Sequence, residues 1–271
     1  ADLSMVIPTH KGSEKIPNLL NSIKKSSLIP NQIIIVGTSQ DDFKKLENYM
    51  QILNLEFYIS NYANQVFQRN EGFKKVNQSY IIQSDDDIIF DYNCIKLLMN
   101  EAKNNKNYLL SPIIVDEFNE LADKRSIDLY KNYFLLIMIY LFLNGFKKVK
   151  GGTILFSGRP VPDVSTNDNR EWLNSCICFA SENLIDYIYF NSNGKSYYED
   201  VYTSHNYFKK GYFLKKIYNA KIIHKRTKKF NFLQHLNSIK NQYEIVKKFK
   251  KSSFFFLFDV LIFTIIFMIY K

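Results

Sequence analysis

Cysteine is scarce in this sequence, and the number and spacing of the cysteines argue against a disulfide framework and against a zinc site. The 271 residues include three, Cys94, Cys176 and Cys178. Because their number is odd and their spacing fits no zinc motif, we expect reduced thiols in a cytoplasmic protein. We also expect no signal peptide, since the apolar run at residues 5–8 is far too short for one. We therefore expect the chemistry to take place inside the cell.

Acidic residues are outnumbered by basic ones. The chain has 26 Asp and Glu against 36 Lys and Arg, which gives a net charge of +10. This excess predicts an acidic partner, either nucleic acid, an anionic membrane surface or a phosphorylated substrate. The apolar fraction of 46% and the charged fraction of 23% are typical of a folded protein. The length allows one large domain, or one domain with an appendage.

The strongest chemical signal lies in residues 80–90, where apolar residues flank Asp85, Asp86 and Asp87 on both sides. Residues 80–83 predict a short strand. Three adjacent carboxylates repel one another, and a divalent cation with oxygen ligands would offset that repulsion. Because side chains two apart share a face in an extended chain, Asp85 and Asp87 can converge on one metal while Asp86 points elsewhere. A solvated acidic turn is the alternative interpretation.

Strands and helices alternate along the first third of the chain. The β-branched run at residues 33–36 is typical of a strand covered on both faces. Apolar residues at helical spacing follow it, and we also expect a short helix over residues 70–78. The alternation predicts a parallel α/β sheet with right-handed crossovers. Ligands bind at the carboxyl ends of the strands in such sheets, and residues 85–87 fall at that end.

Two apolar runs stand out in the second half. Residues 133–143 are too few to span a bilayer, so we interpret them as a buried helix. A helix that dips into a membrane surface beside Lys147 and Lys148 is the alternative. Residues 252–270, interrupted by Asp259, are long enough to span a bilayer or to lie in its interface, with a buried core helix as the alternative. The basic stretch before them favours a cytoplasmic body.

Four features follow one another along the chain: a strand with Pro8 and Thr9, the three aspartates 85–87, the segment 172–175 (WLNS), and the acids 199–200 ahead of residues 210–212 (KGY). This succession resembles the family 2 glycosyltransferases with the GT-A fold. Residues 5–11 (MVIPTHK) resemble the first-strand motif vvIPtyn, and residues 68–72 (QRNEG) resemble aRNxG. Residues 83–87 (QSDDD) are similar to flDxD, and residues 199–212 to EDvdlxxRlxxxGy. A histidine near the last core strand is matched by His224. The resemblance covers roughly residues 3–225.

The resemblance implies an α/β fold of the GT-A (nucleotide-diphospho-sugar transferase) type, with a Rossmann-like mixed sheet flanked by helices. We expect this transferase domain over residues 1–225. A basic amphipathic helical segment should follow at 226–251, and a hydrophobic membrane-anchoring segment at 252–271. The last two segments would form a membrane-associating helical tail.

The resemblance also implies roles for particular residues. Mn²⁺ or Mg²⁺ would be held by Asp87 and Asp85, with His224 as a further ligand. The donor nucleotide would be bound by Pro8, Thr9, Arg69, Asp85 and Asp86.

The acceptor side of the implied site is formed by later residues. Asp200 is the expected base, because a carboxylate within reach can take the proton of an acceptor hydroxyl. Glu199 would orient Asp200 or the acceptor. Simple capping of a first helical turn is the alternative for both acids. Trp172 would lie beside the acceptor, although a core position is the alternative for it.

Two departures from the family pattern leave the nucleotide and the sugar open. The acidic motif vDDgSxD after the second strand is replaced by VGTSQD at residues 36–41. The carboxylates that usually bind the base and the ribose are therefore missing there. The glycine usual after the tryptophan is Asn174 or Ser175 here.

These observations predict a metal-dependent, inverting glycosyltransferase at the cytoplasmic face of the cell membrane. It would move a sugar from a nucleotide-diphosphate donor to a lipid-linked or surface-glycan acceptor, as in O-antigen or capsule synthesis. One alternative is a non-catalytic protein that binds sugars or lipid phosphates on the same fold. A metal-dependent nucleic-acid enzyme is the other. We expect no nucleic acid partner, because much of the positive charge sits beside the apolar tail, where an anionic membrane surface accounts for it.

Overall fold

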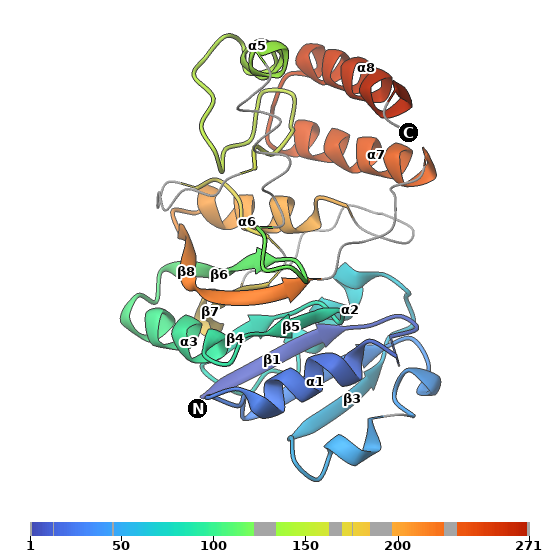
Figure 1. Cartoon of the computed structure of the whole chain (residues 1–271), viewed down its shortest axis with the longest axis vertical. Coiled ribbons are helices and arrows are strands. Elements are labelled where there is room, and N and C mark those ends of the chain that lie inside the picture. The colour runs from blue at the N-terminus through green and yellow to red at the C-terminus, as the bar shows by residue number, and fades with distance from the viewer. Residues whose placement is uncertain are drawn as a thin grey trace.

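The computed structural model describes residues 2–12, 14–44, 46–121, 134–162, 170–174, 176–184, 197–224 and 232–269 (Figure 1). The strands are β1 (Leu3–Pro8), β2 (Gln32–Gly37), β3 (Leu55–Ile59), β4 (Tyr80–Gln83), β5 (Ile88–Phe90), β6 (Tyr108–Val115), β7 (Ile177–Ala180) and β8 (Phe213–His224). The helices are α1 (Ile16–Lys25), α2 (Gln65–Phe73), α3 (Cys94–Asn104), α5 (Phe134–Leu143), α6 (Glu199–Lys209), α7 (Phe232–Lys248) and α8 (Ser253–Ile269). Three short 3-10 helices are η1 (Gln40–Asp42), η2 (Glu47–Tyr49) and η3 (Ser181–Asn183).

The described strands form one eight-stranded sheet in the order β3-β2-β1-β4-β7-β6-β8-β5. β3, β2, β1 and β4 are parallel, as the alternation of the first third predicts. β7 runs antiparallel to β4, and β5 antiparallel to β8. The sheet is therefore mixed, and the mixed α/β architecture implied by the resemblance is confirmed.

Side chains of the central strands alternate between two hydrophobic clusters, one on each face of the sheet. Met5 and Ile7 of β1 belong to the cluster that includes residues of α1 and α3, whereas Val6 belongs to the cluster that includes Phe73 of α2. All six residues of β1 and all six of β2 are buried, as expected for strands covered on both faces. Gly72 lets α2 approach β1 closely, because a Cβ at this position would lie 2.5 Å from Val6 Cγ1.

Helix α2 begins earlier than the sequence predicts. Asn64 caps it, and the Asn64 side chain accepts hydrogen bonds from the backbone of Val66 and Phe67. The helix ends at Phe73, so residues 74–78 of the expected helix are not helical. This shift matters for the site, because it places Gln65, Gln68 and Arg69 on the helix that packs against β1 and β2.

The C-terminal helices pack on the segment that precedes the tryptophan. Ile245 of α7 clusters with Ile154 and Trp172, and Gln242 Nε2 donates to the Ser157 carbonyl at 2.9 Å. Figure 1 shows α5, α7 and α8 gathered at the end of the molecule away from β1, β2 and β3. Among the described residues, no helix is both long and apolar enough to cross a membrane.

Helix α5 differs from the expected buried helix. Residue 133, its expected first residue, lies outside the described ranges. Of the residues in α5 only Leu143 is buried, while Phe134 is 76% and Leu135 71% exposed. The prediction of a buried helix is therefore wrong for most of α5, because an apolar composition alone does not say whether a core is available to receive it.

Candidate active site

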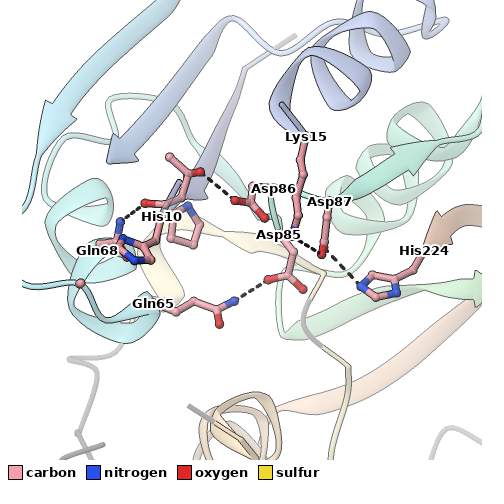
Figure 2. Close-up of a pocket in the computed structure, with 11 residues that line it drawn as sticks. His10, Lys15, Gln65, Gln68, Asp85, Asp86, Asp87 and His224 are labelled. Atoms are coloured by element: carbon pink, nitrogen blue, oxygen red, sulfur yellow. Dashed lines mark hydrogen bonds and ion pairs between the residues drawn. The ribbon is translucent and has the colours of Figure 1, made fainter. Parts of the chain in front are cut away.

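A cleft of about 490 Å³ opens at the carboxyl ends of β1 and β4. Figure 2 shows side chains from several elements converging on it. β4 ends at Gln83 and β5 begins at Ile88, so the three aspartates occupy the turn between two strands. The lining residues are Pro8, Thr9, His10, Lys15, Ala63, Gln65, Gln68, Asp85, Asp86, Asp87 and His224. The predicted site residues of β1, of the acidic turn and of the last core strand are thus brought together.

Asp87 lies between two basic side chains. Its carboxylate is 3.3 Å from His224 Nε2 and 3.3 Å from Lys15 Nζ. The hydrogen bond with His224 is the main cause that lowers the pKa of Asp87 well below its usual range, although burial opposes the shift. Burial tends to lower the pKa of Lys15, but Asp87 and Asp86 outweigh it and raise that pKa. Asp87 therefore presents a fully ionised carboxylate to the cleft.

Asp86 has a different environment. Thr9 Oγ1 donates a hydrogen bond of 2.7 Å to Asp86 Oδ2. Burial raises the pKa of Asp86 to about 6, and the hydrogen bond from Thr9 works against this rise. Gly12 makes room for the contact, because a Cβ at this position would lie 1.9 Å from Thr9 Oγ1 and 2.6 Å from Asp86 Oδ2. This contact ties the loop after β1 to the acidic turn.

Asp85 turns toward α2. Its Oδ1 accepts hydrogen bonds from Gln65 Nε2 at 2.6 Å and from Arg69 Nη2 at 2.5 Å. The predicted convergence of Asp85 with Asp87 is therefore not seen in these contacts. The alternation argument assumed an extended segment, and the strand ends before the aspartates begin.

Arg69 links the acidic turn to α6. Its side chain is 0% exposed, and its Nη1 bonds to Glu199 Oε1 while its Nη2 bonds to Asp85. Glu199 is itself buried in the first turn of α6, where burial raises its pKa and Arg69 opposes the rise. The guanidinium therefore binds the carboxylates of Asp85 and Glu199. Arg69 is not among the residues that line the cleft described above.

Asp200 follows Glu199 in the first turn of α6. Its Oδ1 accepts a hydrogen bond of 2.8 Å from the backbone N–H of Val201. Burial, and then the neighbouring charge of Glu199, raise the pKa of Asp200 to about 7. α6 is preceded by Tyr198, whose φ of 63° is left-handed and turns the chain sharply into the helix. A carboxyl group with such a pKa can exchange a proton near neutral pH.

Trp172 is a core residue in this structure. It is 9% exposed and packs in a cluster with Ile154, Val201, Tyr202 and Ile245. Neither Trp172 nor Asp200 is among the described residues that line the cleft. Any acceptor contact through Trp172 would need a surface other than this cleft.

Two protein groups are placed to hold a cation. Asp87 and His224 face each other across 3.3 Å, and both line the cleft. In the described part of the chain, no group of three or more His, Cys, Asp or Glu side chains gathers in a metal-binding arrangement. A cation at Asp87 would therefore draw its remaining ligands from a substrate or from water.

Sequence reasoning missed Lys15, Gln65 and Gln68. Gln68 Nε2 donates to the carbonyls of Thr9 and Val36 at 2.5 and 2.7 Å, so it fixes the ends of β1 and β2. It lies inside the matched segment QRNEG, and Gln65 precedes Arg69 by four residues on the same helical face. Lys15 stands at the amino end of α1, where the helix dipole disfavours a positive charge. A lysine at the start of a helix, where positive charge is unfavourable, was therefore the signal in the sequence that could have identified Lys15.

The family model described as Glycosyl transferase family 2 matches residues 4–158. No curated protein sequence matches the chain. Among solved structures, the chain is similar to S. aureus TarS, with a TM-score of 0.56 and 15% identity over 90% of this chain and 38% of that one. TarS 1-349 in complex with UDP-GlcNAc gives a TM-score of 0.56 and 15% identity over 90% and 65% of the two chains. GalNAc-T7 with UDP, GalNAc and Mn²⁺ gives a TM-score of 0.59 and 14% identity over 90% and 48%.

These structural likenesses establish the fold, and the match to the family model covers the half of the chain that holds α1, α2 and the acidic turn. The chain spans less than two thirds of the length of each of these solved chains.

Proposed function

The chain belongs to glycosyl transferase family 2, and from that premise we propose that it moves a sugar from a nucleotide-diphosphate donor to an acceptor hydroxyl. As a member of this family it is a glycosyltransferase. The single observation that carries the donor assignment is the cleft, where Asp87, Lys15 and His224 lie together at the carboxyl ends of the strands. A nucleoside diphosphate carries concentrated negative charge, which the ammonium group of Lys15 in this cleft suits.

The same groups fit a divalent cation, and we include Mn²⁺ or Mg²⁺ in the proposal. Asp87 offers an ionised carboxylate and His224 a ring nitrogen. Mg²⁺ is usually held by one or two carboxylates, together with substrate phosphates and water, so two protein ligands suffice. When bound, such an ion stabilises the charge that develops on the leaving diphosphate. GalNAc-T7, solved with UDP, GalNAc and Mn²⁺, supports this choice of cofactor.

The remaining residues of the cleft would position the donor. Lys15 can move from Asp87 to a phosphate oxygen, because the Lys15 side chain is 58% exposed and its contact with Asp87 is 3.3 Å long. Pro8 and Thr9 line the cleft on the side of β1, and Thr9 holds Asp86 at the cleft wall. The UDP-GlcNAc complex of TarS 1-349 supports a uridine nucleotide as the first donor to test.

The proposed base is Asp200. An acceptor hydroxyl becomes a good nucleophile only as its proton is removed, and a carboxylate with a pKa of about 7 can take that proton at neutral pH. Glu199 would act as a positioning residue, since its bond to Arg69 connects the first turn of α6 to Asp85. A single base on the acceptor gives direct displacement at the anomeric carbon, so the product would have inverted configuration.

The proposed acceptor is a lipid-linked or surface glycan at the cytoplasmic face of the cell membrane, as in polysaccharide biosynthesis. The support is the C-terminal region, where the apolar helix α8 follows a basic stretch that includes α7. Positive charge beside an apolar segment favours anionic lipid.

Replacing Asp87 with Asn should abolish most of the metal-dependent activity. The variant keeps the size of the side chain but loses the charge that holds the cation, so we expect transfer to fall by about 10²-fold or more. Nucleotide binding should also lose its dependence on Mn²⁺. The exposed Asp91, four residues further on, provides the matched control Asp91→Asn, which should leave both properties unchanged.

The assay is release of nucleoside diphosphate from a panel of nucleotide sugars, with Mn²⁺ or Mg²⁺ and with or without glycan acceptors. We expect one donor to be used, with EDTA and Asp87→Asn each suppressing release. Near wild-type release by Asp87→Asn would remove the metal assignment. Binding of a nucleotide sugar with no release under any condition would favour the non-catalytic alternative.

A further inference from the structure

Two helices expose many large apolar side chains. On α5 these are Phe134, Leu135 and Met138, which are 40–76% exposed. On α8 they recur along one stripe of the helix, with exposed fractions between 38% and 66%. The residues of that stripe are Phe254, Leu257, Phe258, Leu261, Ile265 and Met268. We refer to the exposed residues of both helices together as the apolar face.

The two helices are far apart in sequence but lie side by side. The ring centroids of Phe142 and Phe258 are 5.3 Å apart, and those of Phe142 and Phe255 are 5.5 Å apart. Further along, Tyr140 and Phe263 meet edge to face at 6.1 Å. Figure 1 shows α5 next to α8 at one end of the molecule. The apolar face therefore belongs to a pair of packed helices and not to a tail that leaves the fold.

A buried ion pair fixes which side of α8 faces the protein. Asp259 is 0% exposed and accepts hydrogen bonds from Arg159 Nε at 2.8 Å and Arg159 Nη2 at 2.6 Å. Ser157 Oγ donates a third, at 2.9 Å. The guanidinium carbon of Arg159 also lies 3.4 Å from the ring centroid of Phe263. Asp259, the acidic residue of α8, therefore faces inward and is neutralised. The outward stripe of the helix is wholly apolar.

Positive charge gathers at one end of the apolar face. The chain leaves α5 through exposed lysines and enters α8 through others, and the rings of Phe156 and Phe255 bring the two stretches together at 6.3 Å. Lys147 Nζ lies 5.1 Å from the Phe156 ring centroid. The exposed lysines are Lys147, Lys148, Lys150, Lys247, Lys248 and Lys250.

The apolar face and the lysines at one end of it together indicate the kind of partner. The apolar face of a second copy of the chain carries no negative charge to match these lysines, so self-association would leave their charge uncompensated. An anionic membrane surface accepts apolar side chains below the headgroups and attracts lysines at headgroup level. We propose that α5 and α8 together form an interfacial docking surface for an anionic membrane, with both helices lying in the plane of the interface.

This inference deepens the proposed acceptor, because a membrane held here would present lipid-linked glycans to the enzyme. The docking itself does not depend on transfer, so it can be tested without a donor or an acceptor. The test is flotation of the full chain with phosphatidylcholine vesicles, with and without phosphatidylglycerol. Nucleotide binding by each variant, measured separately, distinguishes failure of docking from failure of the proposed transfer reaction.

Three double variants probe the surface. Leu257→Glu with Leu261→Glu changes α8, and Leu135→Glu with Met138→Glu changes α5. Met50→Glu with Ile52→Glu is the matched control, since Met50 and Ile52 are 52% and 50% exposed but belong to the segment before β3, outside the apolar face. We expect the wild type to float with anionic vesicles. Both helix variants should lower the partition coefficient by about tenfold or more, because each loses two apolar side chains that would enter the membrane and places two acids at the interface. The control should not change it.

The basic end makes a separate contribution. Lys147→Gln with Lys148→Gln should weaken binding to anionic vesicles by about tenfold, with little effect on neutral ones. Raising the salt concentration should have the same selective effect.

Three results would overturn the proposal. The first is a wild type that fails to bind anionic vesicles. The second is an α5 variant that binds like the control while circular dichroism shows that it is folded. The third is a dimer, detected by light scattering, that the helix variants convert to monomers. That result would make the apolar face a contact between copies.

Discussion

Asp200→Asn is expected to lower turnover by at least about 10²-fold, the low end for loss of a general base. The amide keeps the shape of the side chain and can stay beside the backbone N–H of Val201, but it cannot take a proton. Affinity for the nucleotide should remain close to that of the wild type, because Asp200 does not line the donor cleft. Steady-state kinetics and calorimetry with the nucleoside diphosphate measure the two quantities separately.

A matched control is Asp41→Asn, since Asp41 is 74% exposed and pairs only with the neighbouring Lys44 among the contacts described. This variant should keep wild-type turnover. Loss of nucleotide binding by Asp200→Asn would move Asp200 into the donor site. NMR of the product linkage adds a check, because retained anomeric configuration would contradict displacement assisted by a single base.

The pH dependence of the wild type follows from the same residue. Burial raises the pKa of Asp200 to about 7, so its ionised, proton-accepting form is lost as the pH falls below that value. The rate of transfer should therefore decline by about tenfold per pH unit on the acid side of 7. In Asp200→Asn this acid limb should be absent. A wild-type rate that stays constant down to pH 5 would exclude Asp200 as the base.

The second large effect is expected for Arg69→Met. This change removes the guanidinium that bonds to both Asp85 and Glu199, and it leaves Glu199, which is 5% exposed, without this partner. Breaking a buried ion pair on one side costs about 3–5 kcal/mol, so urea denaturation should show a loss of that order in the free energy of unfolding. Lys15→Met removes a cation whose side chain is 58% exposed, and it should cost about 1 kcal/mol or less.

Arg69→Lys separates charge from geometry. A lysine keeps one positive charge but cannot bond to two carboxylates with the planar fork of a guanidinium. We expect it to recover part of the stability while turnover stays low, because the first turn of α6 is then no longer tied to the acidic turn. If Arg69→Met unfolds at the same urea concentration as Lys15→Met, the buried network has no structural importance.

The first half of the fold could be read from the sequence because its signals are local. The β-branched run of β2 and the apolar stripe of α1 each describe one element, and their alternation implies the parallel strands. The acidic turn could be located in the same way. The separate partners of its three aspartates could not, because they come from α1, α2, the loop after β1 and β8.

The C-terminal half shows what local patterns leave open. Asp259 interrupts an apolar run in the sequence, and its partner Arg159 lies 100 residues earlier, where no periodicity connects the two. Trp172 resembled an acceptor residue by its place in the order of motifs, and it packs in a core cluster. Burial of this kind depends on long-range contacts, which composition and spacing do not encode.

The most direct test of the central claim is a crystal structure with Mn²⁺ and the nucleoside diphosphate that supports turnover. The diphosphate should occupy the cleft at the ends of β1 and β4, with the cation bound by Asp87 and His224 and with Lys15 moved onto a phosphate oxygen. Density for the nucleotide elsewhere, for example in the cavity of about 450 Å³ between α7 and α8, would contradict the account.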